Sequence, residues 1–224
     1  MRRKNFPKIV AINIDGTSLN FESLFNDWHN KVYGLDFKVD EYKDKPFSKL
    51  LGITSDEVDK RILKFYKSPA FSRVPFVKGF KEFIYNLVYN QYSAYFITSR
   101  PENYKGPIPN LVRKYTLMNL NYFFEKKLFS NFHLLFSKPW DEPSSQIPSK
   151  GEICKLFKIP FMVDDSYSEA LECEKNDIIT FLVPSRYNYV EKNKDYIMNS
   201  KHIIPVRSLM DAFWQMQTTY NNIN

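Results

Sequence analysis

A short apolar segment near the start of the chain ends in polar side chains with the potential for chemistry. Residues 9–14 are apolar except for Asn13, and Asp15, Gly16 and Thr17 follow. A buried strand that ends in two projecting carboxylates suits phosphoryl transfer, because one carboxylate attacks phosphorus and the other handles the proton of the leaving group. At Asn13 the amide nitrogen has a delocalised lone pair and the amide oxygen carries no charge. The segment therefore has the shape of such a site without its attacking group.

Three further segments place polar residues where a predicted strand ends or a predicted helix begins. These residues are Thr98, Ser99 and Arg100 after residues 94–97, Lys150 at the start of a helical segment, and Asp164 and Asp165 after residues 161–163. In parallel sheets, ligands bind beyond the carboxyl ends of the strands. We therefore expect the polar residues at the strand ends to converge with Asn13 and Asp15 on one site.

In this order, the four segments resemble those of the haloacid dehalogenase (HAD) superfamily, and within it the 5′-nucleotidase-like branch with a small helical cap. The resemblance covers roughly residues 8–190. It departs from the family at Asn13, which stands where the family has its aspartyl nucleophile. The resemblance implies an α/β fold, namely a Rossmann-like three-layer parallel sheet with a small helical cap insertion.

The resemblance also implies catalytic and phosphate-binding roles. Asn13 would replace the nucleophile, and Asp15 would be the general acid or base. Thr98 and Ser99 would bind phosphate oxygens, and Lys150 would neutralise the phosphate charge. With an amide in place of the nucleophile, the covalent route through an acyl phosphate is closed.

A magnesium ion is the cofactor that the resemblance implies. The backbone carbonyl of Asp15 would face Mg²⁺, and Asp164 or Asp165 would hold it. Hard cations favour carboxylates over amide carbonyls. Because Asn13 removes one anionic oxygen from this set, we expect Mg²⁺ to bind weakly or not at all.

Several of these residues also fit ordinary structural roles. Asp15 fits a turn, and the paired aspartates fit the cap of the helix after them. Lys138 competes with Lys150 because both follow the same predicted strand. A lysine at a helix start opposes the helix dipole, so an anionic partner there would explain Lys150. Arg100 fits either a phosphate or a carboxylate partner.

Strand and helix patterns alternate along the chain, which predicts a parallel sheet with helical crossovers. Predicted strands lie at 9–14, 94–97, 132–136, 161–163 and 178–183, and predicted helices at 21–32, 54–65, 80–88, 110–120, 150–157, 166–173 and around 210–214. Residues 138–149 are a predicted surface loop. We assign residues 1–18 and 76–210 to the core domain, 19–75 to the cap, and 211–224 to a helix end with a frayed polar tail.

Length and composition favour a globular protein that needs no disulfide bonds. The chain has 224 residues, 43% of them hydrophobic, which suffices for one domain with an insert. No apolar run approaches the roughly 20 residues that span a bilayer, so we expect no membrane association and a cytoplasmic location. Cys154 and Cys173 are expected to be free buried thiols, and the three scattered histidines do not predict a zinc site.

Two functions from different classes fit the sequence. The first is a pseudo-phosphatase, inactive or strongly impaired, that binds a nucleotide or phosphate, or a protein, RNA or ribosome partner. The second is an active Mg²⁺-dependent phosphohydrolase in which Asp15 activates water. We favour the first because of Asn13. The net charge of +7 suits a polyanion, although a Lys- and Asn-rich composition explains it equally well. An RNA partner would bind with an affinity that falls steeply with salt.

Overall fold

The fold is built on one parallel β-sheet. The computed structural model describes residues 7–38, 47–101, 110–123, 132–139, 146–185 and 193–223. Six strands pair in the order β3-β2-β1-β4-β5-β6, and every pair is parallel. The strands are β1 (Ile9–Asn13), β2 (Ser93–Thr98), β3 (Phe132–Phe136), β4 (Phe161–Asp164), β5 (Ile179–Leu182) and β6 (Ile203–Pro205). The predicted α/β fold is confirmed.

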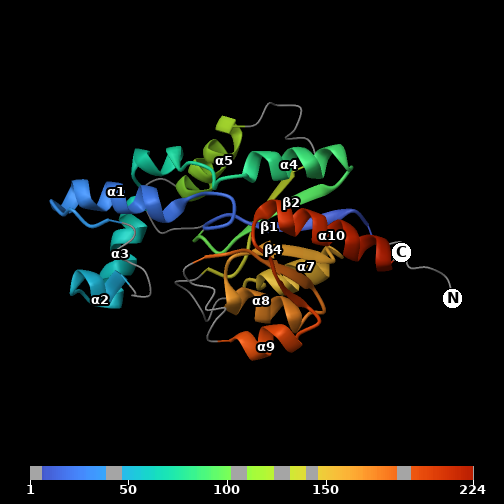
Figure 1. The fold of residues 1–224 in the computed structure, drawn as a ribbon. Coiled ribbons are helices and arrows are strands. Elements are labelled where there is room, and N and C mark those ends of the chain that lie inside the picture. The colour runs from blue at the N-terminus through green and yellow to red at the C-terminus, as the bar shows by residue number, and fades with distance from the viewer. Residues whose placement is uncertain are drawn as a thin grey trace.

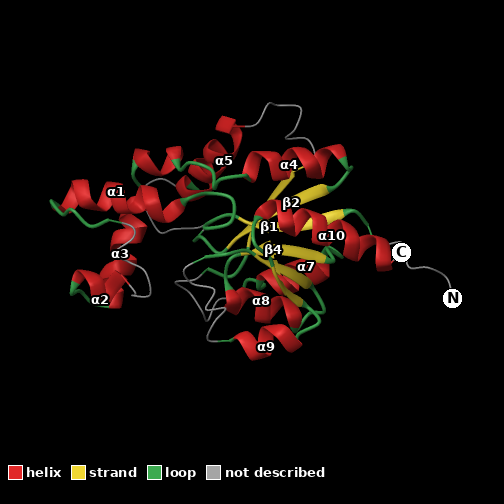
Figure 2. Ribbon diagram, viewed as in Figure 1, coloured by secondary structure: helices red, strands yellow, loops and turns green. Residues whose placement is uncertain are grey.

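Helices cover both faces of the sheet and make three layers (Figures 1 and 2). One face carries α4 (Phe80–Tyr89), α5 (Leu111–Phe123) and α10 (Leu209–Ile223), and the other carries α7 (Lys150–Leu156), α8 (Tyr167–Glu174) and α9 (Lys194–Asn199). Successive side chains of a strand point to opposite faces, so Val10 and Ile12 join the first layer and Ala11 joins the second. Both faces of β1 are therefore buried, which explains its continuous apolar run.

A group of helices between β1 and α4 forms the cap, which lies to one side of the sheet (Figure 1). It consists of α1 (Phe21–Tyr33), α2 (Phe47–Leu51), α3 (Ser55–Tyr66) and the 3₁₀ helix η2 (Pro69–Arg73). Aromatic rings hold α1, α3 and η2 together: the Phe65 ring centroid lies 5.5 Å from that of Phe21, 5.5 Å from that of Phe25 and 5.6 Å from that of Phe71. The same apolar cluster continues into the core, so packing fixes the cap on the sheet.

The structure differs from the sequence prediction at the C-terminus and in several short elements. The expected frayed tail is wrong, because α10 continues to Ile223. The Tyr220 ring packs 6.1 Å from that of Tyr92, and the Lys8 ammonium lies 5.6 Å from the centre of each ring. The elements β6, α9, η2 and α2 were not predicted. Of the predicted loop 138–149, residues 140–145 lie outside the described residues.

The packing of α7 against α8 depends on a glycine. Gly151 lies where the two helices meet: a Cβ at this position would clash with the backbone oxygen of Glu172 and lie 2.8 Å from the Asn176 side-chain nitrogen. The two helices therefore approach each other closely at this glycine.

Cys154 and Cys173, one in each of these helices, are free and buried, as predicted. None of the described helices is long and apolar enough to cross a bilayer.

His29 is a buried histidine of the cap helix α1. It is fully buried in α1, and its Nε2 lies 3.0 Å from Nη1 of Arg61 in α3. The guanidinium can only donate, so Nε2 accepts and the ring is neutral with its proton on Nδ1. Burial first, and the charge of Arg61 second, lower the pKa of His29 from 6.5 to about 4.

We expect His29 to make the protein less stable in mild acid. Between pH 6.5 and about 4 the unfolded chain binds a proton at His29 that the folded chain rejects. The free energy of unfolding therefore falls as the pH drops through this window, by up to about 3 kcal/mol. Urea unfolding at a series of pH values should show a shallower fall for His29→Gln than for wild type.

The matched control is His133→Gln, which removes an exposed histidine from β3. It should keep the pH dependence of the wild-type protein. If His29→Gln and wild type lose stability in parallel between pH 6.5 and 4, His29 is not the group responsible.

Candidate functional site

The candidate site lies at the carboxyl edge of the sheet, where β1, β2 and β4 end. Asn13 is the last residue of β1 and is only 7% exposed. Its Nδ2 donates to the backbone oxygen of Asp15 at 2.7 Å and to Oδ1 of Asp165 at 2.8 Å. Its Oδ1 accepts from Nζ of Lys150 at 3.0 Å. The amide thus joins the loop after β1, the loop after β4 and the start of α7.

The orientation of this amide is set by its partners. Lys150 has only protons to offer, so it must face the amide oxygen. The carbonyl of Asp15 and the carboxylate of Asp165 are acceptors, so they must face the amide nitrogen. The reverse orientation would set the NH₂ group against an ammonium and the oxygen against a carboxylate. All three contacts therefore agree on one orientation.

Asp15 is held by a buried arginine. Arg100, 1% exposed, donates from Nε to Oδ2 of Asp15 at 2.7 Å and from Nη2 to Oδ1, which makes a two-pronged ion pair. Its remaining nitrogen, Nη1, donates to the Thr116 hydroxyl at 2.7 Å. The guanidinium lies 4.6 Å from the ring centre of Phe71 and 5.9 Å from that of Tyr66. The sequence left the partner of Arg100 open, and the structure shows that it is a carboxylate.

Lys150 is buried at the start of α7 and reaches into the site. Its Nζ lies 2.8 Å from Oδ2 of Asp164 and 3.9 Å from Oε1 of Glu169. Burial alone would lower the pKa of Lys150, but the charges of Asp164 and Glu169 and the hydrogen bond to Asp164 outweigh it, so the pKa is raised. The ammonium therefore stays charged and is shared between Asp164 and Asn13.

Asp165 is buried against the loop that comes after β1. Its Oδ1 accepts from Asn13 and from the Thr17 hydroxyl, both at 2.8 Å. A Cβ on Gly16, whose φ is +81°, would clash with Oδ2 of Asp165, so only glycine lets this carboxylate approach. Burial and then the charge of Asp164 raise the pKa of Asp165, and the hydrogen bonds from Thr17 and Asn13 oppose this shift.

The predicted phosphate-binding hydroxyls have other partners in this structure. The Thr98 hydroxyl is buried and accepts from the backbone nitrogen of Arg100 at 3.3 Å. The Ser99 hydroxyl lies 3.2 Å from the Ser137 hydroxyl and donates to Oε1 of Glu169 at 3.2 Å. Ser99 lines a second hollow of about 370 Å³, together with Ser137, Lys138, Pro139, Ser149, Lys150, Ser168, Glu169 and Glu172.

Of the two candidate lysines, the structure brings Lys150 to Asn13, while Lys138 lines the second hollow. Both aspartates of the pair after β4 contribute: Asp164 binds Lys150, and Asp165 binds Asn13. The structure therefore brings Lys150, Asp164 and Asp165 together around Asn13 and pairs Arg100 with Asp15, whereas no hydrogen bond joins the Thr98 hydroxyl to Asn13 or Asp15 among the described residues.

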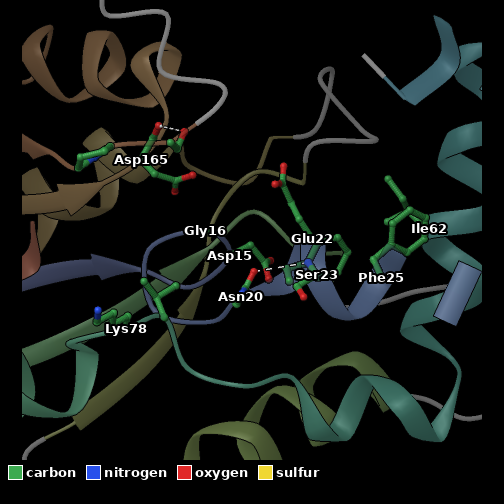
Figure 3. Close-up of a pocket in the computed structure, with 13 residues that line it drawn as sticks. Asp15, Gly16, Asn20, Glu22, Ser23, Phe25, Ile62, Lys78 and Asp165 are labelled. Carbon is green, nitrogen blue, oxygen red and sulfur yellow. Dashed lines mark hydrogen bonds between the residues drawn. The ribbon is translucent and has the colours of Figure 1, made fainter. Parts of the chain in front are cut away.

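A cavity of about 650 Å³ opens between the core and the cap beside this cluster (Figure 3). Asp15, Gly16 and Asp165 border it from the core, and Phe25 and Ile62 border it from the cap. Its other lining residues are Asn20, Phe21, Glu22, Ser23, Val77, Lys78, Pro184 and Ser185. Pockets of this size hold small ligands such as cofactors or metabolites. The lining includes three carboxylates, one cation and several apolar side chains.

Solved structures share this architecture, although no family model matches the sequence and no curated protein is detectably similar to it. A haloacid dehalogenase-like hydrolase from Streptococcus pneumoniae superposes with a TM-score of 0.61, covering 96% of this chain and 100% of its own, at 10% identity. A predicted phosphatase from Clostridium acetobutylicum gives a TM-score of 0.58, covering 98% and 99%, at 13% identity. The chain has the HAD-like hydrolase fold.

A third neighbour was solved with ligands bound. It is the D,D-heptose 1.7-bisphosphate phosphatase from B. bronchiseptica, complexed with magnesium and phosphate, with a TM-score of 0.56, 94% and 98% coverage, and 10% identity. Identities this low establish a common fold and leave activity to be argued from the site itself. The HAD-like architecture predicted from the motifs is thus present, with Asn13 at the end of its central strand β1.

Three contributors to the site were not predicted from the sequence. Thr17 binds Asp165, Thr116 binds Arg100, and Glu169 lies near Lys150 and Ser99. Thr17 lies within the motif after β1, so its proximity was readable from the sequence. Thr116 is one of several polar residues inside helix α5, where no local pattern marks it. Glu169 lies in the first turn of α8, three residues after the N-cap Ser166, a position that capping alone explains.

We expect Lys150→Met to destabilise the protein by about 3–5 kcal/mol, because it leaves the Asp164 carboxylate buried without its cation. The double variant Lys150→Met/Asp164→Asn should recover part of this loss, since it also removes the stranded charge. Urea unfolding would measure both free energies. Lys155→Met, on the exposed side of the same helix, is the control and should change stability by less than about 0.5 kcal/mol. Equal losses in the single and double variants would contradict the assigned ion pair.

Proposed function

We propose that this protein is a pseudo-phosphatase of the 5′-nucleotidase-like branch of the HAD superfamily. In this proposal Asn13 replaces the aspartyl nucleophile, the chain is inactive or strongly impaired as a phosphohydrolase, and it acts as a binding or regulatory factor. The observation that carries the proposal is the position of Asn13, which ends the central strand and points its amide into the carboxylate cluster. Loss of a nucleophile from a concerted site costs on the order of 10⁶ in rate.

The surroundings of Asp15 also favour binding over turnover. A general acid must release a proton from one of its oxygens, and a general base must take one up. Both carboxylate oxygens of Asp15 accept from Arg100, and Arg100 is itself packed against Phe71 and bonded to Thr116. This geometry suits an anchoring role for Asp15 better than activation of water.

The cavity between core and cap is the proposed binding site. Among the described lining residues, Lys78 is the single cation beside three carboxylates, Asp15, Glu22 and Asp165. Arg100 already pairs with Asp15, and we expect Lys78 to be the group that pairs with a phosphate or another anionic group of a ligand. Phe21, Phe25 and Ile62 offer apolar contact to a base or another ring. Phe25 and Ile62 lie on the cap side of the cavity (Figure 3). A nucleotide, which has an anionic end and an aromatic end, matches both. This supports a nucleotide-like ligand.

The proposed loss of phosphohydrolase activity is tested by measuring phosphate release. The substrates are a panel of nucleoside monophosphates and an aryl phosphate, in the presence of Mg²⁺. We expect wild type to lie at least about 10³-fold below Asn13→Asp, because only the variant has an attacking carboxylate. Asn199→Asp makes the same charge change on the exposed helix α9 and should stay as inactive as wild type. Wild-type turnover at the ordinary enzyme rate of about 1–10³ s⁻¹ would rule out the proposal.

The binding arm uses a variant that fills the cavity. Ile62→Trp adds bulk to the cap wall, so it should abolish the rise in melting temperature that a bound nucleotide gives to wild type. Leu156→Trp adds the same ring at a position that is 72% exposed and should leave the rise intact. A panel of nucleosides and nucleotides in thermal unfolding provides the measurement. Wild type that responds to none of them, or Ile62→Trp that responds as wild type does, would count against this cavity.

A further inference from the structure

We propose that the side-chain amide of Asn13 takes the place of a divalent cation, so that the folded site is complete without Mg²⁺. The resemblance implies a magnesium ion between the backbone carbonyl of Asp15, the paired aspartates and the residue at position 13. Two of these oxygens, from Asp15 and Asp165, instead receive hydrogen bonds from one nitrogen. The donor set of this chain therefore does not fit the metal.

The contacts of Nδ2 show the replacement directly. The nitrogen lies 2.7 Å from the Asp15 carbonyl oxygen and 2.8 Å from Oδ1 of Asp165, and its two protons serve these two acceptors. A metal ion held by the same two oxygens would have to displace this NH₂ group. The same Oδ1 also accepts from Thr17 at 2.8 Å, so it is already bound twice.

Lys150 prevents the amide from turning to bind a metal. For Asn13 to offer its oxygen to a cation, the amide must rotate by half a turn, which places its NH₂ group where Oδ1 now accepts from Nζ at 3.0 Å. Two donors would then face each other. Lys150 cannot withdraw, because it is 3% exposed and paired with Asp164 at 2.8 Å.

Asp164, the other carboxylate implied for the metal, is also engaged. Its Oδ2 binds Lys150, and its Oδ1 accepts from the backbone nitrogen of Ser166 at 2.9 Å. The carboxylate of Asp15, which the resemblance does not imply as a ligand, is held on both oxygens by Arg100. Protein donors therefore serve both oxygens of Asp164, the Asp15 carbonyl and Oδ1 of Asp165, where a hard cation would bind.

A single substitution should reverse this state. In Asn13→Asp, one oxygen of the new carboxylate keeps the hydrogen bond from Lys150. The other oxygen then faces the Asp15 carbonyl and the Asp165 carboxylate, with no proton between them. Three converging oxygens and an added negative charge attract a divalent cation. The variant is expected to need metal for full stability, whereas wild type is not.

The test measures metal binding and is independent of phosphate release. The inference about the metal can therefore fail while the proposed function holds, and the proposed function can fail while the inference holds. Thermal unfolding is followed with and without 10 mM MgCl₂ at constant ionic strength, and binding of Mn²⁺ is titrated by electron paramagnetic resonance. We expect the melting temperature of wild type to shift by less than about 1 °C, and that of Asn13→Asp to rise by about 5 °C or more. Asn199→Asp should behave as wild type.

Each outcome bears on the inference. Wild type that binds one Mn²⁺ per chain as tightly as Asn13→Asp overturns it. If the variant does not fold, stoichiometric binding of Mn²⁺ by wild type alone overturns it. An Asn13→Asp protein that folds but binds no Mn²⁺ also overturns it, because the amide would then not be what excludes the metal. Binding of Mn²⁺ at least about 30-fold tighter by the variant than by wild type supports the inference.

Discussion

The hydrogen bonds of one amide decide the state of the whole site. Asn13 accepts from Lys150 and donates to Asp165 and to the backbone of Asp15, so it joins groups that would otherwise repel or stay unpaired. Two buried cations serve the carboxylates around it. Arg100 pairs with Asp15, and Lys150 pairs with Asp164 and lies 3.9 Å from Glu169.

The carboxylate of Asp165 is held by hydrogen bonds from Asn13 and Thr17. Burial and the neighbouring Asp164 raise its pKa, so it holds a proton more readily than an exposed aspartate does. A further carboxylate in place of Asn13 would add negative charge beside Asp165 and remove one of the two donors that Asp165 now has. The proposed loss of the metal is therefore tied to the amide at position 13.

Arg100 contacts both the site and the cap. It joins the loop after β1 through Asp15, helix α5 through Thr116, and the base of the cap through the rings of Phe71 and Tyr66. The aromatic cluster of the cap is continuous with the core below it. The hydrogen bonds of the guanidinium go to Asp15 and Thr116, and its contacts with the cap are to the two rings. Arg100 therefore lies where the site, α5 and the base of the cap meet.

The sequence predicted the parts of this structure that depend on local pattern and chain order. Continuous apolar runs identified β1 and β4, and the rule that parallel strands end at one edge brought Asn13, Asp164 and Asp165 together. The rest depends on contacts between distant residues. The pairing of Asp15 with Arg100 spans 85 positions, and no local signal distinguishes a carboxylate from a phosphate as its partner.

The short elements and the C-terminal helix were not predicted, because they too depend on contacts between residues that are distant in the sequence. Strand β6 has three residues, too few to show a period, and it is defined by its pairing with β5. The polar end of the chain looked unable to hold a helix, but Tyr220 packs on Tyr92 and orders it. Tertiary contacts here override a local propensity, which summed over a short segment amounts to a few kcal/mol at most.

The close approach at Gly151 extends the site beyond the residues that touch its atoms. Helix α7 can lie against the Glu172 carbonyl only because residue 151 has no side chain, and the first residue of that helix is Lys150. The spacing between α7 and α8 thus determines how far the Lys150 ammonium reaches over the carboxyl edge of the sheet. A single methyl group at residue 151 would push α7 away from α8. It would thereby shift the Lys150 ammonium relative to Asn13 and Asp164 without altering the chemistry of any of these groups.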